Sequence, residues 1–469
     1  MSRHLVLGLA WLVLGLFGGC GEDTTKPVDA ALPDQGVVSD TMSDQGATQV
    51  DALGPDISDI AFDVADTSDA ALLDASDVMV EDSFVEDSGP IDTGPPPLDA
   101  APEWFYQTKL ESILTDEDGE SDQFLIELPE ETTSVFLQVE SEEDYAFYTL
   151  KTVVTPKPLN QIIVKGAGDA TCIPCLNRVS AAQKVASFLM PNDPQIEVKG
   201  GKWLFRLRAT GVLKTAGDVI SYPPVSSTAD VTILARTQPV PDSGVLRLHL
   251  HFTGAGGLTA DSAPSDERLA AGISAASEIM ASAGVEFVVA GYHDVPGVDE
   301  DPTLLALEST IGNPNDLSKL LLLGQSEDVS ALNVFFVNSI YKDGDFAGGG
   351  LVLGIAAGIP GPAFLGPSYR SGVVVAVFEQ GDGEDYLGNV IAHEIGHYLG
   401  LYHSTESNGA LHDTLLDTAE NDTQNLMFWA YSQEQKTLSA NQGHVIRSHP
   451  LVLPFDNEEQ ELPNPPETP

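Results

Sequence analysis

Five residues in one short segment have the types and the spacing of a metal-dependent hydrolytic site. The segment reads His393-Glu394-x-x-His397-x-x-Gly400-x-x-His403. Imidazole nitrogens are preferred ligands of Zn²⁺, and three protein ligands leave one position of the ion open for water. Glu394 directly follows the first histidine, so its carboxylate can take a proton from that water. The pattern therefore predicts a zinc centre with its own general base.

The same spacing predicts how the chain folds around the ion. Residues four apart lie on one face of a helix, so His393 and His397 can point at the same metal. Apolar residues recur at helical spacing over 387–398, which supports a helix with a buried stripe. Gly400 is suited to the left-handed turn that ends a helix, and such a turn would bring His403 back as the third ligand.

The alternative is a surface helix with incidental histidines. A short H-E-x-x-H match occurs by accident in many proteins. The chain has 43 Gly and 10 His in 469 residues, so the additional Gly and His would both fall at these offsets by chance roughly once in 500. The extended motif therefore favours the zinc centre.

A second feature lies at Met427, 24 residues beyond His403, in the run Asn425-Leu426-Met427-Phe428-Trp429. On its own, a methionine beside aromatic residues is ordinary core. Together with the zinc motif, it resembles the metzincin metallopeptidases. That resemblance implies that Met427 forms a methionine turn, an apolar floor beneath the metal.

Within the metzincins the chain most resembles the pappalysin-like group. The segments that carry this similarity are 397–403, 417–418, 425–427 and 438–442. One departure concerns a tyrosine that many metzincins place two residues after the methionine. Trp429 stands there, and Tyr431, two residues later, is the candidate for transition-state support.

An acidic loop follows the zinc motif. It contains His412, Asp413, Asp417, Glu420 and Asp422. Hard oxygen ligands crowded in a loop are suited to Ca²⁺, although their spacing matches no defined calcium loop. The resembled group binds calcium near this region. The sequence leaves two interpretations open, a calcium site and a solvated loop.

Residues 239–452 are predicted to form the catalytic domain after a proline-rich hinge at 239–241. Strands and an alanine-rich helix alternate before the zinc helix, which indicates an α/β sheet packed on helices. The expected strands are 245–252, 285–290, 332–340 and 372–378, and the expected helix is 265–283. The glycine-rich run 348–354 is either the edge strand that lines the cleft in metzincins or a loop.

Residues 103–238 are predicted to form an antiparallel β-sandwich. Short runs alternate between apolar and polar residues and are separated by turns. No catalytic constellation is visible there, so substrate binding, surface binding, a structural spacer, an intramolecular chaperone and a latency segment all remain open. The predicted fold class is therefore α+β and multidomain, with a sandwich followed by a metzincin-type α/β domain.

The chain has three cysteines, Cys20 and the closely spaced Cys172 and Cys175. In an exported chain this spacing favours a local disulfide. A zinc site would require two further ligands, and a redox motif would require a βαβ context. A thiol that caps the catalytic zinc is the remaining alternative.

The first 20 residues have the layout of an export signal. A basic start precedes the apolar run 5–17, which is too short to span a bilayer, and Gly18-Gly19-Cys20 follows. This ending resembles the bacterial lipobox and implies a signal peptide at 1–20 with Cys20 lipidated. Gly21 rather than aspartate follows, which implies an outer-membrane or cell-surface lipoprotein. A plain signal peptide is the alternative.

Residues 21–102 carry much of the formal net charge of −50. They contain about twenty Asp and Glu against Lys26 alone. Such a segment cannot bury enough surface to fold, so we expect a disordered, self-repelling linker. Residues 453–469 are expected to be a disordered tail. The acidic excess argues against nucleic acid as a partner.

The sequence therefore predicts a membrane-anchored zinc endopeptidase that acts on a protein or peptide substrate. Glu394 would be the general base, with metal ligands His393, His397 and His403. A second interpretation is a surface binding protein or adhesin with a non-catalytic zinc fold. Intact ligands and an intact Glu394 argue against it. Substrate preference does not follow from the sequence.

Overall fold

The computed structural model describes residues 101–455 except 144, 166–170, 173–174, 212, 215–219, 296–303, 308–315, 326, 343–351, 378–383, 408 and 433. The expected signal peptide with Cys20, the acidic linker and nearly all of the C-terminal tail lie outside the described residues. Most of the glycine-rich run 348–354 does so as well. Among the described residues, no helix is both long and apolar enough to cross a membrane.

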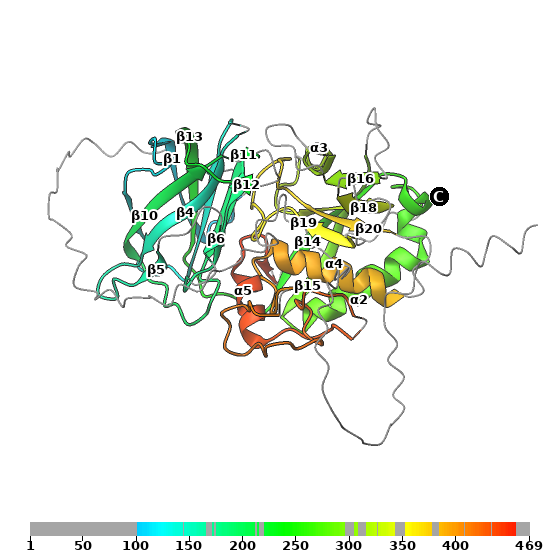
Figure 1. The fold of residues 1–469 in the computed structure, drawn as a ribbon. Coiled ribbons are helices and arrows are strands. Elements are labelled where there is room, and N and C mark those ends of the chain that lie inside the picture. Colours follow the sequence, from blue (N-terminus) through cyan, green and yellow to red (C-terminus); the bar gives the residue numbers. More distant parts are fainter. Residues whose placement is uncertain are drawn as a thin grey trace, which may run out of the picture. The chain divides into compact units, whose positions relative to one another are not determined.

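Two antiparallel sheets form the N-terminal half of the described chain (Figure 1). The first has the strand order β1 (Phe105–Thr115), β13 (Ser227–Arg236), β3 (Ser134–Glu140) and β9 (Val185–Met190). The second has the order β2 (Phe124–Leu128), β10 (Gly201–Thr210), β4 (Phe147–Val154) and β5 (Ile162–Lys165), and β8 (Ala182–Gln183) pairs with β4. Two short pairs accompany them, β6 (Thr171–Cys172) with β7 (Val179–Ser180) and β11 (Leu213–Lys214) with β12 (Ile220–Ser221).

The two sheets enclose one apolar core, as in a β-sandwich. Trp203 and Phe205 of β10 and Val231 and Ile233 of β13 belong to the same cluster of buried side chains. In β10, buried residues alternate with less buried ones, as expected for a strand with one face on the core. Strand β10 is one of the alternating runs from which the sandwich was predicted.

Strand β3 departs from this alternation because both of its faces are buried. Val135 and Leu137 point into the sandwich core, whereas Phe136 belongs to a second cluster together with residues of the C-terminal half. Strand β9 behaves in the same way, since Phe188 lies in the sandwich core and Leu189 in the second cluster. These two strands therefore join the sandwich to the rest of the fold.

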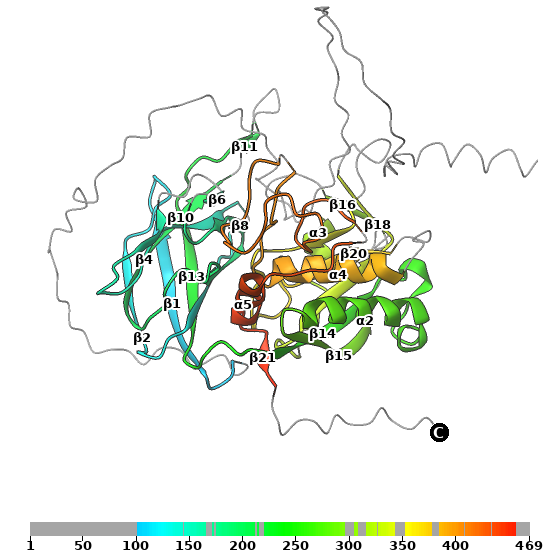
Figure 2. The ribbon, with the colours of Figure 1, turned by 90° about the horizontal axis from the view of Figure 1, so that it is seen from below.

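A six-stranded mixed sheet forms the centre of the C-terminal half (Figure 2). Its order is β15 (Val285–Asp294), β14 (Gly244–Phe252), β17 (Leu332–Val337), β20 (Val373–Ala376) and β19 (Gly354–Ala356), with β21 (Leu453–Pro454) against β14. The pairs formed by β19 and β21 are antiparallel and the others are parallel. Strand β19 is therefore the edge next to β20.

Helices pack on this sheet and on one another. They are α2 (Glu267–Ala281), α3 (Asp316–Leu321), α4 (Glu384–Tyr398) and α5 (Ala440–Ser448), with the short 3-10 turns η2 (Ala255–Gly257) and η3 (Ala263–Ser265). Helix α4 lies beside α2 in both views of the ribbon. The predicted mixture of α and β structure, with antiparallel sheets, is confirmed.

One predicted strand is divided in two. The run 332–340 was expected to be continuous, but β17 ends at Val337 and β18 (Ser339–Lys342) pairs with β16 (Leu304–Leu307) in a separate parallel ribbon. The apolar run extends through both, so composition alone does not show where the chain leaves the main sheet.

Candidate metal centre

Helix α4 and the turn after it bring the three histidines of the motif together. His393 and His397 are one turn apart on α4, and Gly400 has the left-handed φ of 108° that redirects the chain. The Nε2 atoms of His397 and His403 are 3.2 Å apart. One nitrogen from each of the three rings lies within 4.8 Å of the others. The predicted convergence of the three rings is present.

The other nitrogen of each ring has a hydrogen-bond acceptor. Nδ1 of His393 donates to the carbonyl oxygen of Leu426 at 2.6 Å, and Nδ1 of His397 donates to that of Leu401 at 2.7 Å. Nδ1 of His403 donates to the Glu406 carboxylate at 2.9 Å. Carbonyl and carboxylate oxygens only accept, so all three protons are on Nδ1 and the Nε2 lone pairs point toward one another.

Three converging nitrogens can hold a cation between them, and the donor set fits zinc. Tetrahedral Zn–N bonds of about 2.0–2.1 Å place two ligand nitrogens about 3.3 Å apart. The distance between the Nε2 atoms of His397 and His403 is 3.2 Å. The three imidazoles can therefore hold Zn²⁺ and leave its fourth position for water or substrate.

Glu394 lies in the buried wall of the same site. Its side chain is only 1% exposed, and with His393 it lines a small pocket. Edge strand β19 comes close to it, because a Cβ atom placed on Gly354 would lie 2.5 Å from Cγ of Glu394. The strand and the carboxylate therefore share one narrow space beside the histidines.

Met427 packs against the middle of α4. It is fully buried, and a Cβ atom placed on Gly396 would come within 2.7 Å of its sulfur. Its backbone is held by the Asn425 side chain, whose amide pairs with Gln442 of α5. Met427 therefore lies against the turn of helix between two ligands. Its role as a methionine turn stays a prediction.

Tyr431 lies in the pocket that contains the expected general base. The residues that line it are Leu353, Asn389, Val390, His393, Glu394, Phe428, Trp429, Tyr431 and Gln435. The Tyr431 ring packs edge-on against Tyr386, with ring centres 5.2 Å apart. Burial and the charge of neighbouring groups raise the pKa of Tyr386 above its ordinary value. Support of a transition state by Tyr431 stays a prediction.

Calcium in the acidic loop is not supported. The Asp417 carboxylate accepts hydrogen bonds from the Ser439 hydroxyl and the Asn441 amide, at the start of α5. Asp413 accepts from the amide of Leu415 and the hydroxyl of Thr418, and burial raises the pKa of Asp413 to about 7. Within the described residues, the three histidines are the one group whose ligand atoms are close enough to hold a metal.

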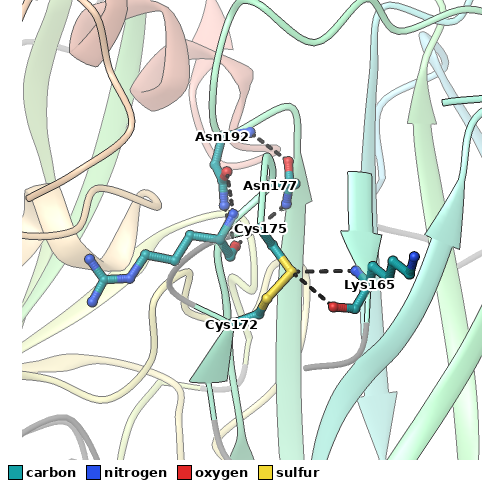
Figure 3. Close-up of a disulfide and its surroundings, with 6 residues drawn as sticks. Lys165, Cys172, Cys175, Asn177 and Asn192 are labelled. Atoms are coloured by element: carbon teal, nitrogen blue, oxygen red, sulfur yellow. Dashed lines mark hydrogen bonds between the residues drawn. A yellow bond between two sulfur atoms is a disulfide. The ribbon is translucent and has the colours of Figure 1, made fainter. Parts of the chain in front are cut away.

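Cys172 and Cys175 form the expected disulfide (Figure 3). The sulfur of Cys175 also accepts a hydrogen bond from the amide of Lys165 on β5. Both sulfurs are used in the covalent bond, so neither is available to cap the metal.

Two residues near the histidines were absent from the sequence prediction. Glu406 is three residues after His403, so its place in the chain was a usable signal. Arg178 is in the sandwich and forms an ion pair with Glu406, Nη2 to Oε1, at 2.8 Å. Burial raises the pKa of Glu406, but His403 and Arg178 outweigh this effect and lower the pKa to about 2.

One comparison with known proteins, that with a family model, agrees with the site. Residues 363–452 match the sequence model of the metallo-peptidase family M12B, reprolysin-like. This segment contains all three histidines, Glu394 and Met427. The match supports a metzincin-like, zinc-dependent peptidase. No curated protein matches the chain.

The similarities to three solved structures are weak. One is infectious bursal disease virus, Gx strain (12% identity, 30% of this chain and 33% of that chain, TM-score 0.14). A second is a Bacillus subtilis protein (10% identity, 46% of this chain and 46% of that chain, TM-score 0.13). A third is a family two carbohydrate esterase from Cellvibrio japonicus (9% identity, 52% of this chain and 70% of that chain, TM-score 0.11). The chain spans a third to a half of the first two, and scores this low carry no argument about fold or function.

Proposed function

We propose that this chain is a zinc-dependent endopeptidase of the metzincin type, closest to the pappalysin-like group. The observation that carries the proposal is the convergence of three imidazole Nε2 atoms, each fixed by a hydrogen bond from its own Nδ1. A buried carboxylate, Glu394, lies beside them. Three neutral nitrogen ligands and a nearby base are the arrangement of a catalytic zinc site rather than a structural one.

His393, His397 and His403 would hold Zn²⁺, which would polarise a water molecule and lower its pKa toward neutrality. Glu394 would accept a proton from the attacking water as its oxygen bonds to the peptide carbonyl carbon. It returns the proton to the leaving amine as the C–N bond breaks. Because Glu394 is 1% exposed, bulk water does not compete for the proton in transit.

Strand β19 and the pocket are suited to an extended peptide. An edge strand offers backbone groups that can pair with a substrate strand. Strand β19 is at the edge of the main sheet and touches Glu394. The pocket walls include Leu353, Val390 and Phe428, so we propose that an apolar side chain of the substrate binds there.

We also propose that the chain is tethered to the outer membrane or cell surface by lipid on Cys20. The support is the apolar run 5–17 followed by Gly18-Gly19-Cys20. Replacement of Cys20 by alanine should shift the protein from the membrane fraction to the soluble fraction of an expressing cell. An unchanged distribution would contradict the tether.

The proposed activity is tested by mass spectrometry of a peptide mixture incubated with purified protein. We expect internal cleavage that stops with a chelator and returns with added Zn²⁺. Zinc-loaded protein that cuts no peptide would overturn the proposal and favour the alternative of a surface binding protein with a non-catalytic zinc fold. Removal of single terminal residues would show an exopeptidase instead.

A further inference from the structure

The third histidine ligand is connected to the sandwich through two side chains. Nδ1 of His403 donates to Oε2 of Glu406 at 2.9 Å, and the other oxygen, Oε1, accepts from Nη2 of Arg178 at 2.8 Å. Each carboxylate oxygen therefore has one partner. Arg178 is 228 positions before Glu406, so this connection joins distant parts of the chain.

The connection is shielded from solvent. Arg178 is 5% exposed and Glu406 is 9% exposed. The guanidinium carbon of Arg178 lies 4.1 Å from the centre of the Tyr402 ring, the residue next to His403. A buried ion pair stacked on an aromatic ring is held in one geometry, and charged hydrogen bonds gain strength where water is excluded.

Another residue of the sandwich, Asn192, holds the backbone of Arg178. Its amide donates to Oδ1 of Asn192, and its carbonyl accepts from the side chain of the same asparagine. Asn177, the preceding residue, accepts from the Asn192 amide and donates to the carbonyl of Leu189 on β9. The disulfide of Cys172 and Cys175 closely precedes Asn177 in the sequence (Figure 3).

A second contact holds the same region of the catalytic half. The hydroxyl of Tyr402 lies 3.0 Å from that of Ser180 in the sandwich and donates to the carbonyl of Ile359 at 3.3 Å. Tyr402 and Glu406 lie on either side of His403 in the sequence. Ser180 contacts Tyr402, and Arg178 binds Glu406.

We propose that the sandwich is a permanent part of the metal centre, in which Arg178 acts as a positioning residue for His403. Arg178 orients Glu406, and Glu406 fixes the tautomer and ring direction of His403. The inference rests on the proposed function only in taking zinc as the metal. It assigns the sandwich a structural role at the site, in contrast to a spacer or a removable latency segment.

The test is the zinc affinity of the full chain, measured by competition with a chelator of known affinity. Loss of a partner of a ligating histidine typically weakens metal binding about 10–100-fold. We expect a weakening of this size in Glu406→Gln, and of about 10-fold, the lower end of this range, in Arg178→Met, because Arg178 acts on His403 through Glu406. Arg178→Lys keeps the charge but loses the planar guanidinium, and we expect a smaller effect.

Arg236→Met is the matched control. Arg236 is also a fully buried arginine of the sandwich that bonds to the catalytic half, through the carbonyl of Val452, and it stacks on Phe105. It has no contact with His403 or Glu406 among the described interactions. Its replacement should lower the melting temperature and leave the zinc affinity unchanged.

An unchanged zinc affinity in folded Arg178→Met would overturn the inference, and so would an equal loss in Arg236→Met. If Arg178→Met does not fold, the zinc affinities of Arg178→Lys and Glu406→Gln test the inference instead. Both variants must bind zinc more weakly than the Arg236→Met control does. Zinc affinity is read without any substrate. An inactive wild type that binds zinc tightly would therefore reject the peptidase and leave this inference standing.

Discussion

The carboxylate of Glu394 is buried beside three imidazoles, and in the proposed mechanism it carries out the proton transfers. Glu394→Gln keeps the shape of the side chain but cannot accept a proton. We expect the rate of peptide cleavage to fall by about 10²–10⁴-fold. The zinc content should stay at the wild-type value, because Glu394 is not a ligand in this arrangement. Cleavage kinetics with zinc determined on the same samples checks both.

The control for this variant is Glu420→Gln, in the loop after the motif, where the carboxylate is 75% exposed. It should cleave at the wild-type rate. Normal activity in Glu394→Gln would remove Glu394 from the mechanism.

A second residue-scale prediction concerns Gly354 on β19. An added Cβ would lie 2.5 Å from Cγ and 2.7 Å from Oε1 of Glu394, so Gly354→Ala must displace the carboxylate. A shift of about 1 Å can reduce a rate about 100-fold, and we expect that loss in kcat with unchanged zinc affinity. Gly366→Ala, where a Cβ would meet no atom within 4 Å, serves as the control. Equal rates for both variants would show that β19 does not constrain the base.

At the scale of elements, His449 links the end of α5 to strand β3. It is fully buried against Phe136, its Nε2 donates to the carbonyl of Gly361, and its Nδ1 accepts from the amide of Leu451. Both nitrogens of a neutral ring are thus used, and protonation would break the second bond. Burial lowers the pKa of His449 to about 3.

The sign of the resulting pH dependence follows from linkage. The unfolded histidine has a pKa of about 6.5, so below that pH the unfolded state takes up a proton that the folded state does not. Stability from this group is present above about pH 6.5 and is lost as the pH falls toward 3. At pH 5 the loss is about 2 kcal/mol.

Urea unfolding at pH 7.5 and pH 5 tests this. The wild type should lose about 2 kcal/mol more than His449→Gln, in which the side chain does not titrate. The metal-ligand histidines are common to both proteins, so their contribution cancels in the difference. Parallel losses in the two proteins would show that His449 does not carry the effect.

At the scale of the whole molecule, the sandwich and the catalytic half share one buried cluster. Phe136, Leu189 and Leu234 of the sandwich belong to the same cluster as Ile395 and Met427. A protease site inserted after Gln238, which is exposed, would cut the connection without removing these contacts. We expect the two fragments to elute together in native size-exclusion chromatography and to keep their activity. Separated fragments, or activity that appears only after the cut, would instead indicate a latency segment.

The sequence predicted the parts of the site that follow from local spacing. The two ligands on α4, the turn at Gly400 and the third ligand all depend on residues within one short segment, where helical geometry dictates the outcome. The alternation in β10 could likewise be predicted, because a strand with one buried face has a period of two. The disulfide between Cys172 and Cys175 could be predicted from their spacing and from the expected export of the chain.

The contacts between distant segments could not be read in this way. Nothing about Arg178 distinguishes it from other arginines in the sequence, and its pairing with Glu406 exists only after both halves have folded. The two buried faces of β3 likewise depend on what packs outside the sandwich. The calcium interpretation, one of two left open by the sequence, came from carboxylate-rich composition, whereas Asp417 binds groups at the start of α5.

X-ray absorption spectroscopy at the zinc edge of the purified full chain measures the coordination shell of the proposed metal centre. We expect one zinc per chain with three imidazole nitrogens at about 2.0–2.1 Å and one oxygen at a similar distance. His403→Ala should lose one nitrogen from that shell. A chain that holds no stoichiometric zinc after equilibration with the ion, or a shell with fewer than three histidines in the wild type, would contradict the proposed metal centre.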